Sequence, residues 1–264
     1  MVAPDLNDWV RCPACADNRQ DLYVQKYPVT NQQFEQFIKA GGYDNPAWWG
    51  GEKSAAWGWR LKGGYRSNDP VSEPEYWQTD NYGKTRRGFP LVGVSWYEAL
   101  AYASWLTDLL RRVRSNDETV TTEERQLVEP LVEKGGQTIT LPTETEWVRL
   151  AGGEADDRYP WDKPGTLVTT DTAEIVRRAN VSESEINTTS PVGMYPQGAS
   201  EPFKLMDVAG NVGEWMNPSG DEDIRVLRGG SWFFGATEAR CACRYGNRPL
   251  YRYGNVGFRL VLSP

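Results

Sequence analysis

The sequence predicts an α+β domain with few short strands, two main helices and long structured loops. Helical periodicity is strong only in short parts of the chain, and its longest apolar face runs from Trp96 to about Arg114. Strand-like alternation is confined to brief segments, whereas glycine, proline and tryptophan fill long stretches that have no period. The chain contains no internal repeat, heptad pattern or low-complexity block, so repeat and coiled-coil architectures are disfavoured.

One domain accounts for most of the 264 residues. We expect the polar, irregular residues 1–21 to form an N-terminal tail or the remnant of another domain, and residues 22–264 to form a single domain. Residues 22–27 alternate enough to form a strand. Thr30 is a good N-cap for a first helix over residues 31–40, which two glycines then end.

The middle of the chain begins with loop sequence. Residues 43–89 are rich in glycine and proline, and we expect their tryptophans, together with Tyr76, to plug the core rather than to stack on a ligand. Ser95 and Glu98 form a capping box, which predicts that the longest helix starts at Trp96.

Shorter elements follow this helix. Residues 115–136 have the pattern of an insertion, part helix and part loop, and residues 138–141 form a short strand. Thr143 and Glu146 are a second capping box, which opens another helix. A final strand is expected over residues 257–262.

Composition limits the classes of partner. The net charge of −7 and the pI near 4.9 argue against a nucleic-acid partner, because such binding depends on neutralising phosphates. No stretch reaches the roughly 18 apolar residues of a membrane span. The first residues lack the basic-then-apolar order of a signal peptide. We therefore expect a monomer that is cytoplasmic by default, while surface display or export by another route stays open.

The four cysteines form two close pairs, Cys12 with Cys15 and Cys241 with Cys243. Four cysteines are too few for a disulfide scaffold. A single C-x-x-C supplies only half of the ligands that zinc needs, and because the chain has no histidine the other two would be Cys241 and Cys243 or would come from a missing segment. Free thiols, a disulfide and half of a zinc site remain open for Cys12 and Cys15.

Residues 225–264 differ in composition from the rest of the chain. Large aromatic residues are mixed there with glycine, asparagine and arginine. A buried strand would alternate apolar and polar residues and would avoid glycine. Tyrosine offers much contact area for few frozen torsions, and glycine and asparagine let loops turn, so the mixture is typical of a contact surface. The alternative is that these rings complete the core of an irregular fold.

Short motifs in a fixed order extend along the chain. They are Pro28-Val29-Thr30-Asn31, Pro90-Leu91-Val92-Gly93-Val94-Ser95-Trp96, Leu141-Pro142-Thr143-Glu144-Thr145-Glu146-Trp147, Tyr159-Pro160-Trp161, Asp207-Val208-Ala209-Gly210-Asn211-Val212-Gly213-Glu214-Trp215, Gly229-Gly230-Ser231-Trp232, Arg240-Cys241-Ala242 and Gly257-Phe258-Arg259. In this order they resemble the formylglycine-generating enzyme (sulfatase-modifying factor) family. The resemblance covers roughly residues 22–262 and implies a variant of the C-type lectin fold.

The resemblance also implies which catalytic groups to look for. Oxidases of the family act through two cysteines, but Phe234 occupies the position of the first, and a shortened loop before Cys241 leaves no counterpart of the second. The iron-dependent relatives use histidines, and this chain has none. We therefore predict no catalytic residue and no enzymatic activity. A copper-dependent peptide-cysteine oxidase that uses Cys241 and Cys243 is the alternative.

Four residues match a calcium-site motif of the family: Asp207, Gly210, Val212 and Glu214. Two carboxylates with main-chain oxygens from a tight loop suit calcium, so the resemblance implies a structural ion there. The alternative is that Asp207 caps a turn and Glu214 pairs with an arginine. A second family site near Asn180 lacks a clearly aligned carboxylate. Calcium-dependent sugar binding, as in some lectins, is a further alternative function.

A second branch of the fold resembles the chain more fully, namely the variable proteins of diversity-generating retroelements. In these proteins an adenine-directed copying process randomises codons in C-terminal loops, here about residues 229–259 (the variable region), and the products exclude Trp, Met, Lys, Glu and Gln. None of these types occupies the thirteen matching positions, although they make up about a fifth of the chain. The thirteen positions, which we predict to bind ligand, are Phe233, Phe234, Gly235, Cys243, Tyr245, Gly246, Asn247, Arg248, Leu250, Tyr251, Tyr253, Gly254 and Asn255.

We therefore predict a non-enzymatic binding protein that displays a diversified C-terminal surface to an unknown macromolecular ligand, most simply a protein. Interface hot spots favour tyrosine, tryptophan and arginine. The residues expected to grip the ligand are Phe233, Phe234, Tyr245, Arg248, Tyr251 and Tyr253. The residues expected to serve the scaffold between them are Arg240, Ala242, Arg244, Pro249, Val256, Gly257 and Phe258.

Overall fold

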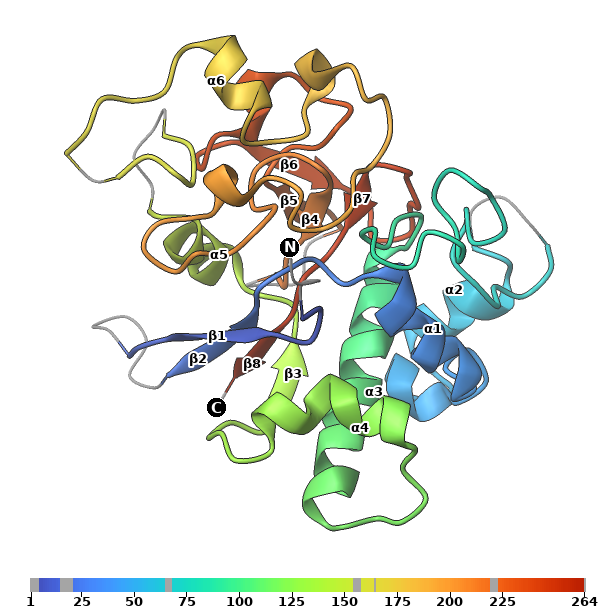
Figure 1. Cartoon of the computed structure of the whole chain (residues 1–264). Coiled ribbons are helices and arrows are strands. Elements are labelled where there is room, and N and C mark those ends of the chain that lie inside the picture. Colours follow the sequence, from blue (N-terminus) through green and yellow to red (C-terminus); the bar gives the residue numbers. More distant parts are fainter. Residues whose placement is uncertain are drawn as a thin grey trace.

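A computed structural model describes residues 5–14, 21–64, 68–153, 158–163, 165–218 and 223–263. Two four-stranded sheets lie beside a group of helices (Figure 1). The strands are β1 (Trp9–Cys12), β2 (Leu22–Gln25), β3 (Thr138–Thr140), β4 (Gly213–Trp215), β5 (Arg225–Arg228), β6 (Arg244–Asn247), β7 (Val256–Gly257) and β8 (Val261–Ser263). The helices are α1 (Asn31–Lys39), α2 (Ala55–Leu61), α3 (Trp96–Arg114), α4 (Thr122–Val128), α5 (Glu144–Leu150) and α6 (Thr172–Val176). The prediction of an α+β chain with few short strands is confirmed.

The first sheet, sheet 1, joins the two ends of the described chain. Its order is β1-β2-β8-β3 and all its pairs are antiparallel, with Val24 opposite Val261. The strand β1 lies inside the predicted tail, and that boundary is corrected because Trp9 pairs with Gln25 and Cys12 is fully buried. The strand has only four residues and their burial does not alternate, so the signal in the sequence was too weak to predict it.

The second sheet, sheet 2, carries the variable region. Its order is β6-β5-β4-β7, with β7 parallel to β4. The strand predicted over residues 257–262 is two strands, since β7 belongs to sheet 2 and β8 to sheet 1. Residues 258–260 cross from one sheet to the other, and Phe258 and Leu260 are fully buried there.

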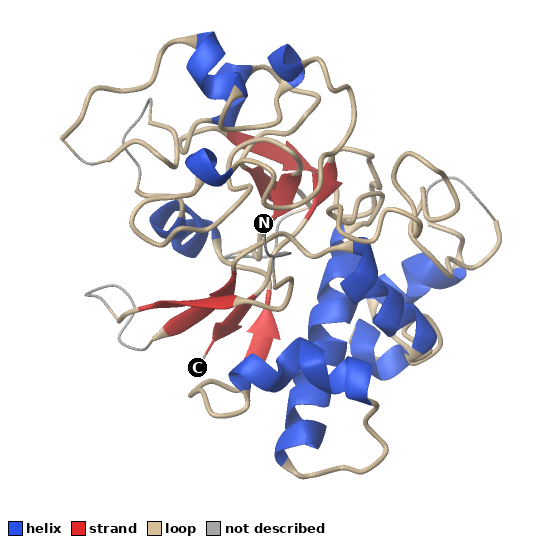
Figure 2. Cartoon of the chain, in the orientation of Figure 1, coloured by secondary structure: helices blue, strands red, loops and turns tan. Residues whose placement is uncertain are grey.

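The helix α3 is the longest element and has the predicted bounds. Its N-cap Ser95 accepts from the N–H of Glu98, whose carboxylate accepts in return from the N–H of Ser95. The buried face of α3 includes Trp105 and Leu109, and the helix packs against β3, α1 and α4. Figure 2 shows α1, α2, α3 and α4 gathered on one side, while α5, α6 and long loops lie around sheet 2.

Residues 43–89 were expected to be loop throughout, but α2 lies within them. Trp49 and Trp77 are buried in the largest apolar cluster, as predicted for core plugs. Tyr76, grouped with them in the prediction, instead lines a pocket. None of the described helices combines the length and the apolarity that crossing a bilayer requires.

Candidate ligand-binding site

The variable region begins with a tight turn after β5. Gly230 has a φ of +68°, and a Cβ at this position would lie 2.8 Å from the main-chain oxygen of Glu238. Glycine is therefore required here, because any other side chain would meet both backbone strain and a steric clash. The turn leaves Phe233 with 62% of its surface exposed.

The aromatic side chains after this turn contact one another in a row. Trp232 meets Phe233 with ring centroids 5.7 Å apart, and Phe233 meets Phe234 at 5.6 Å. Phe234 then stacks on Tyr245 of β6, with centroids 4.9 Å apart and an interplanar angle of 5°. Because such pairs contribute about 0.5–1.5 kcal/mol each beyond their buried area, the rings hold one another in place.

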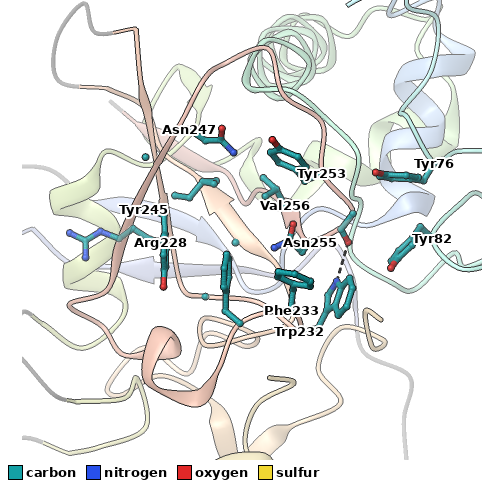
Figure 3. Close-up of a pocket in the computed structure, with 16 residues that line it drawn as sticks. Tyr76, Tyr82, Arg228, Trp232, Phe233, Tyr245, Asn247, Tyr253, Asn255 and Val256 are labelled. Carbon is teal, nitrogen blue, oxygen red and sulfur yellow. Dashed lines mark hydrogen bonds between the residues drawn. The ribbon is translucent and has the colours of Figure 1, made fainter. Parts of the chain in front are cut away.

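Two tyrosines from the loop before α3 continue the row. The ring of Tyr82 stacks on Trp232 at 6.3 Å, and Tyr76 contacts Tyr82 at 5.5 Å. The indole N–H of Trp232 donates to the main-chain oxygen of Gly254 at 3.0 Å, which fixes the ring between the two loops (Figure 3). Segments about 150 residues apart in the sequence thus form one surface.

These rings surround a pocket of about 540 Å³, which we call the aromatic pocket. It is lined by Tyr76, Tyr82, Gly213, Leu227, Arg228, Gly230, Trp232, Phe233, Phe234, Tyr245, Gly246, Asn247, Tyr253, Gly254, Asn255 and Val256. Within the described part of the chain, this lining contains no carboxylate, and Arg228 is its single charged residue. A pocket of this kind suits an apolar or aromatic group that carries a few hydrogen-bonding atoms.

Most of the thirteen predicted ligand-binding positions meet at this pocket. Those that line it are Phe233, Phe234, Tyr245, Gly246, Asn247, Tyr253, Gly254 and Asn255. Those that lie outside its lining are Gly235, Cys243, Arg248, Leu250 and Tyr251. Every one of the thirteen keeps solvent-accessible surface.

The scaffold positions predicted between them divide into two groups. Pro249, Val256, Gly257 and Phe258 are buried, as a scaffold role requires. Ala242 and Arg244 are instead exposed, and Arg240 is partly exposed. The burial pattern thus separates most variable from most fixed positions.

Sequence reasoning missed the far wall of the pocket. Tyr76 and Tyr82 were not predicted to bind ligand, and neither was Trp232. A signal was present, because Asn81-Tyr82-Gly83 has the same mixture of tyrosine, asparagine and glycine as the variable region. We interpreted the whole segment from its tryptophans, which do fill the core, and so overlooked the composition around Tyr82.

Arg228 of β5 anchors the segment that leads into β6. Its Nη1 donates to three successive main-chain oxygens, those of Cys241, Ala242 and Cys243, at 3.1, 2.9 and 3.1 Å. Its Nη2 forms an ion pair with Glu144 at the start of α5. The guanidinium therefore serves the structure, although it reaches the pocket wall.

The two cysteines of the variable region donate hydrogen bonds to main-chain oxygens. Burial raises the pKa of the Cys241 thiol to about 12, and its Sγ donates to the main-chain oxygen of Ala151 at 3.3 Å. Burial also raises the pKa of Cys243, whose Sγ donates to the oxygen of Thr237. Both thiols are therefore protonated near neutral pH in the metal-free chain. Cys12 is fully buried, and Cys15 lies outside the described residues.

The predicted calcium ligands have other partners. Both carboxylate oxygens of Glu214 accept hydrogen bonds from Arg259, at 2.6–2.9 Å, and the indole of Trp147 donates to one of them. Asp207 accepts from the N–H of Gly193 at 2.6 Å. Because the guanidinium already neutralises Glu214, this donor set does not fit a divalent cation.

A better-fitting atom lies at the second predicted calcium position. The side-chain oxygen of Asn180 is buried, and within the described residues it has no hydrogen-bond partner. Calcium binding by the chain stays a prediction.

Replacing Asp207 with asparagine is expected to stabilise the chain at pH 7. Burial raises the pKa of Asp207 to about 6, so the carboxyl group of Asp207 binds a proton more tightly in the folded state than in the unfolded state. Stability is therefore lost as the pH rises from about 4 through 6. Asparagine avoids this loss and tolerates the φ of +54°. We expect a gain of roughly 1–3 kcal/mol in unfolding free energy at pH 7.

The measurement for Asp207→Asn is urea unfolding of both proteins between pH 4 and 7. The difference in unfolding free energy between the variant and the wild type should shrink toward pH 4, where Asp207 of the wild type is protonated in the folded state. A difference in unfolding free energy that does not change with pH would contradict the raised pKa of Asp207. Repeating the series with calcium tests the ion as well, since a calcium ion bound by Asp207 would stabilise the wild type more than the variant.

Comparison with known proteins assigns the fold to a family. The sulfatase-modifying factor enzyme 1-like domain matches residues 6–264. The chain belongs to this family. The start of the match also places β1 inside the domain. Treponema denticola variable protein 1 has the same fold, with a TM-score of 0.53 and 21% identity over 98% of this chain and 92% of that one.

Curated relatives in the family include enzymes. The chain is 27% identical to a hercynine oxygenase of Mycolicibacterium thermoresistibile, over 94% of its own length and 54% of the relative. It is 28% identical to the inactive C-alpha-formylglycine-generating enzyme 2 of Bos taurus, over 89% of its own length and 75% of that protein. The chain thus spans about half the length of the oxygenase.

The prediction that the chain is not an enzyme is contradicted by these relatives. It was based on the absence of histidine and of the two catalytic cysteines. The absence of these residues excludes two known kinds of catalytic site. It does not exclude catalysis by other residues on the same fold. The similarity to named oxygenases overturns the prediction.

Proposed function

We propose that the chain is a ligand-binding protein of the retroelement variable-protein type, which grips a protein ligand with the aromatic pocket and its rim. The observation that carries the proposal is the division of the variable region by exposure. All thirteen positions free of excluded residue types are accessible, and eight of them line one pocket. Pro249, which interrupts the series, and Val256 and Phe258, which follow it, are buried, whereas the fixed positions Ala242 and Arg244 are exposed.

The physical character of the pocket supports a protein ligand. A protein hot spot consists of large rings in a desolvated recess, often surrounded by polar atoms that exclude water. The row from Tyr76 to Tyr245 provides such rings in an ordered arrangement. The fold shared with Treponema denticola variable protein 1 is consistent with this use of the scaffold.

The decisive experiment is to sequence the DNA that flanks the gene. We expect a near-copy of the segment encoding residues 229–259 beside a reverse-transcriptase gene. The two copies should differ only at adenines of the template copy, and mainly at the thirteen positions. Flanking DNA with neither feature would overturn the retroelement part of the proposal.

Simultaneous randomisation of the thirteen positions is expected to leave most clones folded. Exposed substitutions usually change stability by less than about 0.5 kcal/mol each. A matched control library uses the same codons at the buried positions Pro249, Val256, Gly257 and Phe258, where most clones should fail to fold. The measurement is thermal unfolding of purified clones from each library. Equal failure in both libraries would contradict a diversified surface.

An oxygenase is the second candidate, because the chain aligns over 94% of its length with a named hercynine oxygenase. The aromatic pocket is large enough for a small molecule. Oxygen consumption by the purified chain in the presence of hercynine is the direct test. Uptake that the variant Phe234→Ala abolishes would favour this function for the pocket.

A further inference from the structure

The strand β6 forms an outer edge of sheet 2. The N–H of Met216 donates to the main-chain oxygen of Val226 at 2.9 Å, so Val226 directs its main-chain groups toward β4. Hydrogen-bonded and non-hydrogen-bonded pairs alternate along antiparallel strands. Gly246 lies opposite Val226, and its own N–H and C=O therefore point away from β5.

Arg244 repeats this arrangement two residues earlier. It lies opposite Arg228, which pairs with Glu214 of β4, so its N–H and C=O also point outward. In the part of the chain that the structure describes, no hydrogen bond engages these groups of Arg244 or Gly246, and both residues are exposed. Their spacing of roughly 6.8 Å is the repeat of an extended chain.

A comparable edge in sheet 1 is closed by a side chain. The N–H of Ile139 in β3 donates to the hydroxyl of Thr107 at 2.9 Å, and this hydroxyl donates to the oxygen of Ile139 at 3.1 Å. Thr107 thus takes the place of a neighbouring strand. Proteins usually cover such edges because open ones pair with other chains, and β6 has no such cover among the described side chains.

The open edge runs beside the aromatic pocket. Tyr245 and Asn247, which alternate with Arg244 and Gly246 along β6, line the pocket (Figure 3). Arg248, directly after the strand, is exposed and forms no ion pair with any described residue, in a chain whose net charge is −7. A segment lying along β6 would therefore meet a recess for a ring and a free positive charge.

We propose that an extended segment of the protein partner adds to β6 as a further strand of sheet 2. Gly246 and Arg244 bind its main chain, the aromatic pocket takes one large apolar or aromatic side chain, and Arg248 pairs with an acidic residue. This inference rests on the proposed function and specifies the partner's form. Strand addition gives affinity through main-chain bonds and specificity through side-chain pockets.

Strand addition also suits a surface whose side chains change. Main-chain hydrogen bonds at positions 244 and 246 are the same whatever side chains positions 245 and 247 carry. The docking direction of a partner is then preserved when the pocket lining is altered. A surface that depended on side chains for both docking and specificity would lose both together.

The test compares two substitutions of one residue. Gly246→Pro removes the outward N–H, and proline is tolerated on an edge strand where this group faces solvent. Gly246→Ala keeps the N–H and adds only a Cβ, which would lie 2.7 Å from Cγ2 of Ile224, so the exposed Ile224 side chain must rotate about χ1 to make room. Thermal unfolding confirms that both variants fold.

The probe is a set of linear peptides selected on the immobilised wild-type chain from a random phage-displayed library. We expect acidic peptides with one large apolar side chain, and binding to Gly246→Pro at least about ten-fold weaker than to Gly246→Ala by calorimetry. Methylation of single peptide nitrogens should weaken binding at every second residue, because alternate N–H groups of an added strand face β6.

Three outcomes would overturn the inference. Equal binding by the two variants, with loss of binding in Phe234→Ala, would reject strand addition and leave the proposed function standing. Binding that survives Phe234→Ala as well, or a library without binders, would reject the proposed function too. Sedimentation showing a wild-type dimer that Gly246→Pro converts to a monomer would mean that a second copy occupies the edge.

Discussion

Replacing Arg259 with methionine is expected to lower the free energy of unfolding by about 3–5 kcal/mol, because it leaves a buried carboxylate without its counter-charge. Arg259 is 1% exposed and Glu214 is fully buried. Besides Glu214, the guanidinium donates to the main-chain oxygens of Met206, Gln25 and Lys26 at 2.9–3.2 Å. The substitution therefore also leaves three main-chain acceptors without this donor.

Urea unfolding measures this loss, and a double variant provides the control. Glu214→Gln with Arg259→Met removes both charges, so much of the stability should return, since the cost of an isolated charge exceeds that of losing the pair. If the single and double variants are equally destabilised, the cost comes from lost packing and not from the unpaired carboxylate.

Replacing Arg252 with methionine is expected to cost about 3 kcal/mol or more and to loosen the loop that carries Tyr251 and Tyr253. Arg252 forms ion pairs with Glu98 and Glu75, both at 3.0 Å. Glu98 is fully buried and also caps α3, so the arginine fastens the variable region to the longest helix.

The hydrogen-bond network around Glu98 explains why the loss of Arg252 is expected to be costly. Tyr43 donates its hydroxyl to Glu98 at 2.6 Å, and burial together with this carboxylate raises the pKa of Tyr43 well above its usual value. The phenol thus stays protonated and donates, but it is neutral and cannot replace the charge of Arg252.

The matched control for Arg252→Met is Arg248→Met. Arg248 lies four residues earlier but is exposed, and its substitution should change stability by less than about 0.5 kcal/mol. Urea unfolding compares the two variants. Quenching of tyrosine fluorescence by acrylamide would report loosening of the loop. Equal stability of the two variants would contradict an anchoring role for Arg252.

Local signals in the sequence predicted the starts of α1, α3 and α5, whereas α2 lies in a stretch that was expected to be loop. A capping box is complete within four residues, so Ser95 with Glu98 and Thr143 with Glu146 each specify a helix start without reference to the rest of the fold. The final strand was predicted as one element because alternation says which face a residue occupies, not which sheet it joins. The crossing near Arg259 depends on Glu214, which no local pattern reveals.

The part of the candidate site that has a local signal in the sequence was predictable. Phe234 and Tyr245 lie within a short segment of unusual composition, and composition can be read locally. Tyr82 joins them only because the fold brings Trp232 beside it, and such a contact is invisible in a single sequence. The anchoring roles of Arg228 and Arg252 were hidden likewise, because both lie in residues 225–264, where the composition suggests that an arginine contacts a ligand.

The position of β8 has a consequence for how the chain is made. This strand lies between β2 and β3 in sheet 1, with Val261 opposite Val24. During translation, β2 and β3 therefore cannot become part of one sheet until β8 has left the ribosome. Pairings so distant in sequence form slowly, so a nascent chain spends this interval with two strands that chaperones or other nascent chains can reach.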